Sequence, residues 1–156
     1  MTVRSPQVRH VAAADRRRWE QLWLGYLTFY DSSVPQHVTD ATFARLLEDG
    51  PVGGLVAVDA DDRVVGLAHY VVHPTTWDTR PTCYLEDLFV APDQRGGGAG
   101  RALIEHLAAL GRHQGWAGVY WMTADDNAVA RRLYDRLAEV GNWVRYEIDL
   151  PAQGSP

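Results

Sequence analysis

Two carboxylates stand side by side within an apolar stretch of the chain, Glu86 and Asp87 in "YLEDLFVA". A carboxylate beside a reacting group can accept a proton in the transition state, and it can also attract a cation before the reaction. Alternation along a strand would point Asp87 to the face opposite Glu86, unless a bulge reverses it. The pair therefore predicts general-base or cation-binding chemistry for Glu86, and an ion-paired structural role is the alternative.

A glycine-rich segment follows these acids, and a helical pattern begins directly after it. The segment consists of Arg95, Gly96, Gly97, Gly98, Ala99 and Gly100. A helix N-terminus exposes unpaired N–H groups and a partial positive charge, and glycines let a phosphate approach the backbone closely. The spacing does not fit the dinucleotide pattern G-x-G-x-x-G, and the chain has no lysine for a P-loop. The sequence therefore predicts a different phosphate-binding segment, Arg-x-x-Gly-x-Gly, between a strand and a helix.

The elements that must position these residues follow from hydrophobic periodicity. We expect Thr39 to cap the second helix and Asp125 or Asp126 to cap the last one. In the acidic strand, alternation would group Leu85 with Asp87 on one face. The expected order is strand, helix, helix, hairpin, strand, helix, strand, helix and strand, at residues 8–12, 19–30, 39–51, 54–73, 83–91, 100–115, 117–124, 125–141 and 142–150.

The whole chain has 156 residues, a net charge of −5 and one cysteine. This length fits one domain over residues 1–156, with residues 151–156 as a frayed tail. The acidic balance argues against nucleic acid as a partner, and no stretch approaches the ~20 apolar residues of a membrane span. Without the apolar core of a secretory signal, and with Cys83 expected to be a small core residue, we expect a cytoplasmic protein.

The stretch "YLEDLFVAPDQRGGGAG" resembles the strand, loop and helix start of the GNAT acetyltransferase superfamily, and its Leu-Glu-Asp triplet is similar to the polyamine or diamine branch. The spacing of Asn127, Leu133 and Tyr134 resembles a later helix of the same family. The resemblance implies an α/β (α+β) fold. Its mixed, mostly antiparallel central sheet would be flanked by helices, with a cofactor cleft between two splayed parallel strands.

The resemblance also implies acetyl-CoA as the acetyl donor, without a metal, and it makes a homodimer an expectation. Backbone groups of Phe89 and Val90 would pair with the pantetheine arm of the cofactor, and Asn127 would hydrogen-bond that arm. The backbone N–H groups from Arg95 to Gly100 would hold the pyrophosphate.

Acetyl transfer to an amine also requires two proton transfers, one away from the amine and one to the leaving thiolate. With a pKa near that of lysine, ~10.4, about one primary amine in 2,500 is unprotonated at neutral pH. Glu86 is our candidate to accept the proton, directly or through water. Tyr134 can protonate the leaving thiolate, because a phenol has a pKa near ~10 and a thiol near ~8.5. Tyr134 follows Asn127 by two helical turns, so one cofactor could meet both, while N–H groups at a strand bulge would hold the developing oxyanion.

The candidates for binding the acceptor are spread along the chain: Tyr26, Tyr30, Trp77, Asp78 and Asp87. His69 and His73 could reach the acceptor too, although histidines in strands are commonly packed or exposed. We expect a small polyamine or diamine as the small-molecule amine acceptor, attacked in a ternary complex. The alternatives are a peptide N-terminus, a lysine, an amino acid or an aminoglycoside, and, from another class, a non-catalytic CoA-binding regulatory module.

Overall fold

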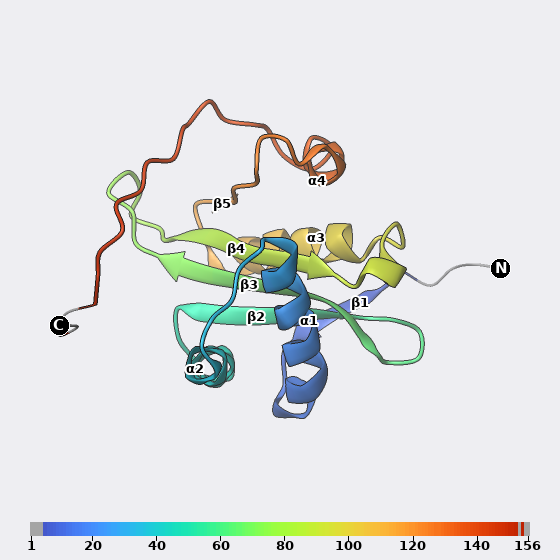
Figure 1. Cartoon of the computed structure of the whole chain (residues 1–156). Helices are drawn as coiled ribbons and strands as arrows, with labels where there is room; N and C mark the ends of the chain where they lie inside the picture. The colour runs from blue at the N-terminus through green and yellow to red at the C-terminus, as the bar shows by residue number, and fades with distance from the viewer. Residues whose placement is uncertain (1–4, 153, 155–156) are drawn as a thin grey trace. The chain divides into compact units, whose positions relative to one another are not determined.

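The computed structural model describes residues 5–152 and residue 154. It divides into two compact units, of which one ends at Met122 and the other begins at Thr123. Among the described residues, the first unit contains all the strands and the helices α1, α2 and α3, and the second contains α4 (Figure 1). Each unit is therefore described by itself.

The first unit is built on one five-stranded sheet whose spatial order follows the chain, β1-β2-β3-β4-β5. Neighbouring strands are antiparallel from β1 to β4, whereas β4 and β5 are parallel. The predicted mixed, mostly antiparallel sheet is thus confirmed, together with the hairpin formed by β2 and β3. The strands span Gln7–His10, Val52–Val58, Val64–His73, Thr82–Val90 and Val119–Tyr120.

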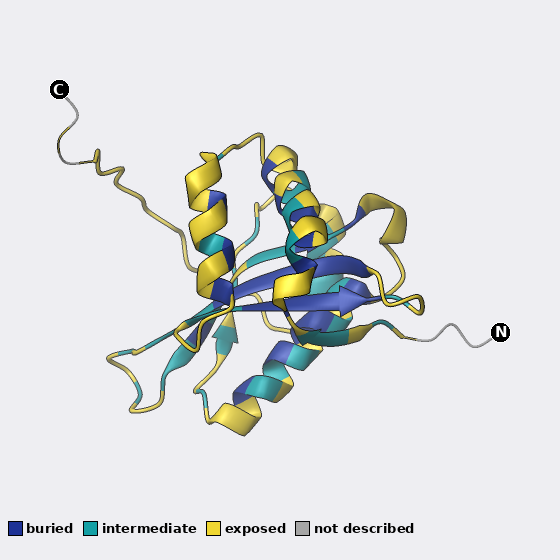
Figure 2. Cartoon of the chain, turned by 90° about the horizontal axis from the view of Figure 1, so that it is seen from below, coloured by how far each residue is buried: buried dark blue, intermediate teal, exposed yellow. Residues whose placement is uncertain are grey.

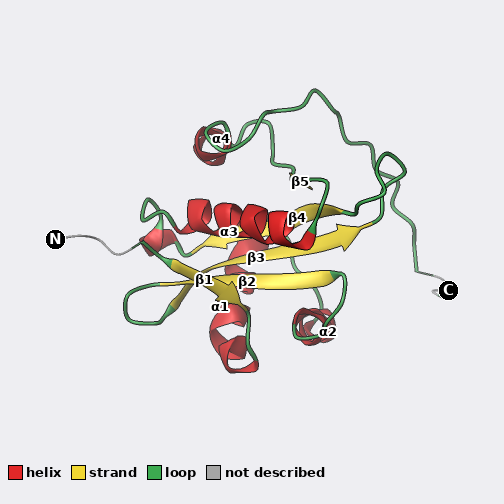
Figure 3. Cartoon of the chain, turned by 180° about the vertical axis from the view of Figure 1, so that it is seen from behind, coloured by secondary structure: helices red, strands yellow, loops and turns green. Residues whose placement is uncertain are grey.

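Helices cover both faces of this sheet, with α1 (Arg16–Phe29) and α2 (Gln36–Leu46) on one face and α3 (Ala99–Gln114) on the other (Figures 1 and 3). The predicted apolar stripe of α1 enters the core through Trp19, Leu22, Trp23 and Leu27. Figure 2 shows the buried residues of the strands lying between the helices. No helix of the described chain has the length and apolar character needed to cross a bilayer.

The predicted cap of α2 is wrong. The helix begins at Gln36 with Pro35 as its N-cap, so Thr39 lies inside it rather than before it. Thr39 is 1% exposed, and its Oγ1 accepts a hydrogen bond from Trp23 Nε1 at 3.2 Å. The hydroxyl group therefore connects α2 to α1 in the core, which the sequence pattern alone does not distinguish from a capping role.

A one-residue bulge in β4 reverses the predicted faces of that strand. His69 of β3 pairs with Asp87, but the next residue of β3, Tyr70, pairs with Leu85, so Glu86 is the extra residue. Because neighbouring residues of β3 point to opposite faces, Asp87 lies on the α1 face and Leu85 on the α3 face. The predicted grouping of Leu85 with Asp87 is wrong, and the alternative in which a bulge turns Asp87 around is confirmed.

The second unit contains α4 (Ala128–Tyr134), which is shorter than the helix predicted over residues 125–141. Neither Asp125 nor Asp126 caps it. Instead, Asn127 is the N-cap, and its Oδ1 accepts a hydrogen bond from the Ala130 N–H at 3.3 Å. An amide side chain performs this role as well as a carboxylate, so the three adjacent candidates could not be ranked from sequence.

Two predicted strands are shortened or missing. β5 forms only over Val119–Tyr120, and residues 142–150, described throughout, carry no strand although apolar and polar residues alternate there. A strand requires hydrogen bonds to a neighbouring strand, and an alternating pattern does not itself supply that neighbour. The strand predictions for residues 142–150 and for most of residues 117–124 are therefore wrong for this structure.

Candidate active site

The glycine segment forms the turn that starts α3. Gly96 and Gly98 have φ angles of +83° and +86°, in the left-handed region that favours glycine. Gly98 is the N-cap, and its carbonyl accepts a hydrogen bond from the Ala102 N–H at 2.9 Å. The N–H groups of Ala99 and Gly100 therefore precede the helical ladder and point out of the helix end. A Cβ atom at Gly96 or Gly98 would meet nothing within 4 Å, so the space beside both residues is open.

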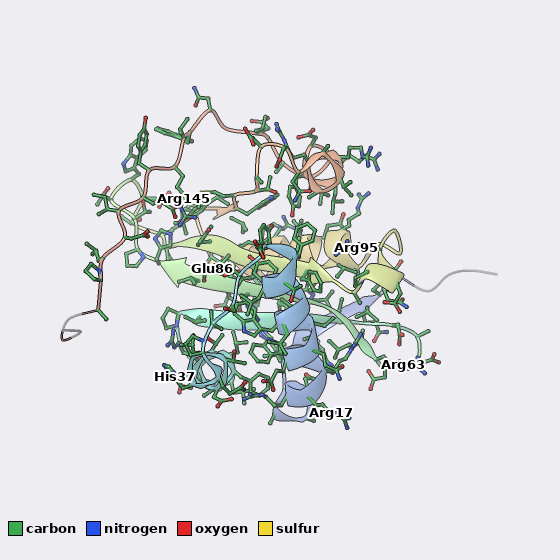
Figure 4. The ribbon with its side chains drawn as sticks, viewed as in Figure 1. Arg17, His37, Arg63, Glu86, Arg95 and Arg145 are labelled. Atoms are coloured by element: carbon green, nitrogen blue, oxygen red, sulfur yellow. The ribbon has the colours of Figure 1, made fainter. Side chains whose placement is uncertain are left out.

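The side chain of Arg95 folds back over the core instead of crossing this loop. Its Nε donates to the Val90 carbonyl at 3.3 Å, and its Cζ lies 5.7 Å from the ring centroid of Phe29 and 5.5 Å from that of Phe89. Figure 4 shows Arg95 in the loop that follows β4. A pyrophosphate at this position would meet backbone N–H groups and the positive end of α3, so the loop fits the predicted cofactor group.

β4 and β5 separate early. Their parallel ladder ends at the pair Tyr84–Tyr120, whereas β4 continues to Val90. The predicted partners of the pantetheine arm, Phe89 and Val90, lie in the part of β4 beyond the ladder. The Phe89 side chain is buried against α1, so only its backbone is suited to a cofactor contact. This arrangement is compatible with the predicted pairing, which stays a prediction.

Glu86 is the extra residue of the β4 bulge and is exposed. In Figure 4 it lies in the middle of β4. A bulge interrupts the ladder and re-aims the backbone around it, and bulges are enriched next to active sites. The predicted base and the predicted oxyanion-binding N–H groups therefore occupy one irregular point of the strand, and both roles stay predictions.

Asp87 lies next to this bulge, close to polar groups from β3 and from the C-terminal end of α1. Its Oδ2 is 2.9 Å from His69 Nδ1, and its side chain is 13% exposed. Burial raises the pKa of Tyr26 above its ordinary value, and the charge of Asp87 and a hydrogen bond to it raise the pKa further. Burial and the charge of Asp87 also raise the pKa of Tyr30, whose ring centroid lies 5.0 Å from that of Tyr26. Both phenols are therefore protonated at neutral pH and lie near one carboxylate.

A second aromatic group lies where β4 and β5 pair. The rings of Tyr84 and Tyr120 are stacked with centroids 5.0 Å apart, and the Tyr120 hydroxyl is 2.8 Å from His73 Nε2. His73 Nδ1 lies 2.8 Å from the Pro74 carbonyl, which can only accept, so Nδ1 donates to it and Nε2 accepts from Tyr120. Sequence reasoning missed both tyrosines. The available signal was that Tyr84 precedes the Leu-Glu-Asp triplet and Tyr120 lies in the strand expected to run parallel to it.

The predicted pair Trp77 and Asp78 lies in the loop between β3 and β4. Trp77 is 89% exposed. Asp78 Oδ2 is 2.8 Å from an Arg80 guanidinium nitrogen, and hydrogen bonds from the Arg80 side chain and backbone hold the pKa of Asp78 at about 2. The carboxylate is thus engaged by a residue of its own loop, and the structure adds no support to its predicted role in binding the acceptor.

In the second unit, Asn127 and Tyr134 stand at the two ends of α4. The Asn127 side chain caps the helix, and its Nδ2 donates to Thr123 Oγ1 at 3.2 Å. Tyr134 is the last residue of the helix and is half-buried. The helical connection that the spacing predicted is therefore present, while the contacts of either residue with a cofactor stay predictions.

Cys83 is fully buried, and this burial raises the pKa of its thiol to about 12. The prediction of a core residue is confirmed, and little thiolate exists at neutral pH. No group of three His, Cys, Asp or Glu side chains in the described part of the chain could hold a metal ion. A hollow of about 90 Å³ lies at the turn between β2 and β3, lined in part by Gln7, Val58 and Asp62, and no predicted site residue lines it.

Comparison with known proteins assigns the chain to a family. The acetyltransferase (GNAT) family model matches residues 17–138. The D-amino-acid N-acetyltransferase HPA3 of Saccharomyces cerevisiae is 32% identical over 142 residues, which cover 90% of this chain and 88% of that protein. The aminoglycoside N(6')-acetyltransferase type 1 of Stenotrophomonas maltophilia is 30% identical over 120 residues, which cover 74% of this chain and 73% of that protein.

A solved structure gives the same fold. The ribosomal-protein-alanine N-acetyltransferase from Brucella melitensis superposes with a TM-score of 0.78 at 22% identity, over 94% of this chain and 100% of that one. Acetyltransferases of this family use acetyl-CoA as donor, which agrees with the open glycine loop at the start of α3. The matches favour an enzyme over a regulatory module, and they do not single out the polyamine branch. The chain therefore belongs to the acetyltransferase (GNAT) family and is an N-acetyltransferase.

Proposed function

We propose that this enzyme transfers an acetyl group from acetyl-CoA to a primary amine of a small polyamine or diamine, by direct attack in a ternary complex. The observation that carries the proposal is the position of Asp87, a carboxylate beside the Glu86 bulge with the phenols of Tyr26 and Tyr30 near it. A diamine has one amine to be acetylated and a second cation to be bound. Two neighbouring carboxylates with aromatic rings suit that pair of groups.

The donor side relies on backbone groups. The N–H groups at the start of α3 would hold the pyrophosphate, and the part of β4 around Val90, beyond the ladder with β5, would hold the pantetheine arm. When bound, acetyl-CoA supplies the activated acetyl group as a thioester. The side chain of Arg95 acts indirectly in this proposal, because its contacts with Phe29, Phe89 and the Val90 carbonyl fix the loop.

The acceptor side relies on side chains. A cation within about 6 Å of an aromatic ring gains ~0.5–2 kcal/mol, depending on how much water is excluded. Tyr26 is partly buried and Tyr30 is half-exposed, so an acceptor reaching Asp87 would meet a partly buried ring and a more accessible one. The charge of Asp87 would bind the second cation of a diamine, leaving Glu86 for the amine that reacts.

In the chemical step, the amine nitrogen bonds to the acetyl carbon and the carbon–sulfur bond breaks. Glu86 accepts the proton that the ammonium group must lose, directly or through water, and the second proton that the nitrogen loses once it has bonded to the acetyl carbon passes to solvent. Backbone N–H groups at the bulge stabilise the negative charge that develops on the acetyl oxygen. Tyr134 gives its proton to the departing thiolate and regains one from solvent. Support for Tyr134 comes from its phenol chemistry and from its helical connection to Asn127.

A D-amino acid is the second candidate acceptor, favoured by the extent of the similarity to HPA3. An amino acid brings a carboxylate as well as an amine, and Asp87 and Glu86 would repel that negative charge. An aminoglycoside, the acceptor named for another relative, carries several amines and would be attracted by the same two acids. Charge at the acceptor side thus separates the candidates, with amino acids disfavoured.

The experiment is a panel of amines assayed for release of free CoA thiol, with the acetylated product identified by mass spectrometry. The panel includes butane-1,4-diamine, a D-amino acid, an aminoglycoside and a peptide with a free N-terminus. We expect the highest kcat/KM for the diamine. A preference for the D-amino acid would replace the proposed acceptor, and the absence of amine-dependent thiol release would contradict the proposed function as a whole.

A further inference from the structure

Behind Asp87 lies a buried series of hydrogen bonds that the chemical step does not use. Trp19 Nε1 donates to His69 Nε2 at 2.9 Å, and His69 Nδ1 is 2.9 Å from Asp87 Oδ2. Trp19 is 0% and His69 is 3% exposed. The series Trp19–His69–Asp87 therefore leads from the core between α1 and the sheet to the partly accessible carboxylate, whose side chain is 13% exposed.

The direction of these hydrogen bonds is fixed by chemistry. An indole N–H can only donate, so Nε2 of His69 must accept from Trp19. A neutral imidazole has one N–H, which is then at Nδ1, and this group donates to Asp87. Trp19 thereby selects the ring form in which His69 presents a donor to the carboxylate.

The packing around His69 leaves the ring little freedom. Its centroid lies 5.8 Å from that of Trp19 and 5.3 Å from that of Trp23, both on α1. The register of β3 and β4 places His69 directly opposite Asp87, next to the bulge. One oxygen of Asp87 is thus held from the core side by His69. A carboxylate constrained in this way presents a defined direction to an acceptor.

We propose that His69, oriented by Trp19, is a positioning and specificity-determining residue that aims the Asp87 carboxylate at the second cation of a diamine acceptor. This inference rests on the proposed function and adds to it the cause of the preference for dications. Without the Nδ1 donor, the carboxylate would rotate about its side-chain bonds, and the bound cation would lose a preorganised partner. His69 itself does not touch the acceptor.

Two substitutions at position 69 separate positioning from packing. His69→Leu removes the donor to Asp87, whereas His69→Asn retains an N–H group close to where Nδ1 stands. We measure the affinity for butane-1,4-diamine and for butylamine by calorimetry in the presence of CoA. We expect His69→Leu to weaken diamine binding by about tenfold, as for a lost hydrogen bond to a charged group, with butylamine and CoA unaffected. His69→Asn should recover most of the diamine affinity.

The chain offers a matched control on α1. Trp19 and Trp23 are both buried, their rings are stacked with centroids 6.1 Å apart, and each indole donates one hydrogen bond. Trp23 donates to Thr39 Oγ1, however, and Trp19 donates to His69. Both substitutions keep an aromatic ring beside His69, so Trp19→Phe and Trp23→Phe should lower the melting temperature by similar amounts. Only Trp19→Phe removes the hydrogen bond to His69 Nε2, so only this variant should weaken diamine binding.

Each result either supports or contradicts the positioning role of His69. Equal diamine affinity in Trp19→Phe and Trp23→Phe, or equal weakening of diamine and butylamine binding by His69→Leu, would show that His69 only packs in the core. Nitrogen NMR of the wild type offers a test without turnover: we expect an N–H at Nδ1 of His69, and one at Nε2 would overturn the inference. A wild type that binds no diamine also overturns it, whereas diamine binding without thiol release contradicts only the proposed function.

Discussion

The donor side and the acceptor side of the candidate active site are built from different chemical groups. On the donor side, Gly96 and Gly98 adopt left-handed conformations, and backbone N–H groups at the start of α3 face open space. On the acceptor side, the side chains of Asp87, His69 and Tyr26 meet across β3, β4 and α1. The first arrangement depends on one continuous segment, and the second depends on strand register. The donor site therefore depends on backbone conformation at its glycines, whereas the acceptor site depends on which side chains the strand register brings together.

The largest effect is expected for Tyr134→Phe. General acid catalysis is worth about 10²–10⁴-fold, so kcat should fall by that factor for every acceptor alike, with acetyl-CoA affinity unchanged. Steady-state rates with a diamine and with butylamine test this. If kcat stayed within about threefold of wild type while chemistry limits the rate, Tyr134 would be a packing residue.

Gly98→Asp should come next, and it should affect only the donor side. The substitution places a carboxylate where the pyrophosphate is proposed to lie, on a backbone with φ of +86°. Acetyl-CoA affinity, measured by calorimetry, should fall by well over tenfold, which is more than ~1.4 kcal/mol.

Gly115→Asp is the matched control for that change. Gly115 has φ of +75°, stands at the other end of the same helix, and a Cβ there also meets nothing within 4 Å. Both variants should lose stability because aspartate is strained in this conformation. Acetyl-CoA affinity that is unchanged in folded Gly98→Asp, or equally weakened in both variants, would contradict the proposal that this loop binds the pyrophosphate.

Glu86→Gln should have a smaller effect, on the acceptor side. It keeps the shape of the side chain and removes its charge, so kcat/KM for a diamine should fall by about tenfold at neutral pH. The loss should shrink as the pH rises towards the amine pKa of ~10.4, because the amine then loses its proton unaided.

Glu105→Gln gives the same change of net charge away from the site. Glu105 is exposed on α3 and pairs with Arg101 at 2.7 Å. Its kcat/KM should match that of wild type at every pH. A loss in Glu86→Gln that is the same at all pH values would instead indicate a structural role for Glu86.

Cys83→Ala should have the smallest effect. Because burial raises the pKa of the thiol to about 12, the nucleophilic thiolate is scarce at neutral pH, and direct attack needs no acyl-enzyme. Activity should stay close to that of wild type once the variant is folded. An acetyl adduct on Cys83 in the wild type, detected by mass spectrometry, together with an inactive Cys83→Ala, would overturn direct attack.

How much the sequence could predict differs between the two sides for a physical reason. The glycine loop was predictable because conformation, spacing and helix start are all local to residues 95–100. The faces of β4 were not, because the bulge at Glu86 depends on pairing with β3 and inverts every side chain beyond it. Trp19 and His69 are 50 positions apart, and the sequence around neither residue indicates that they form a hydrogen bond.

The most direct test of the account is the ratio of kcat/KM for butane-1,4-diamine to that for butylamine, in wild type and in Asp87→Asn. Asparagine has the same shape and can still accept the hydrogen bond from His69, so the variant removes little except the charge. We predict a ratio of about ten or more in the wild type, falling close to one in Asp87→Asn, with acetyl-CoA affinity unchanged. A ratio that is the same in both proteins would contradict recognition of a cationic acceptor by Asp87.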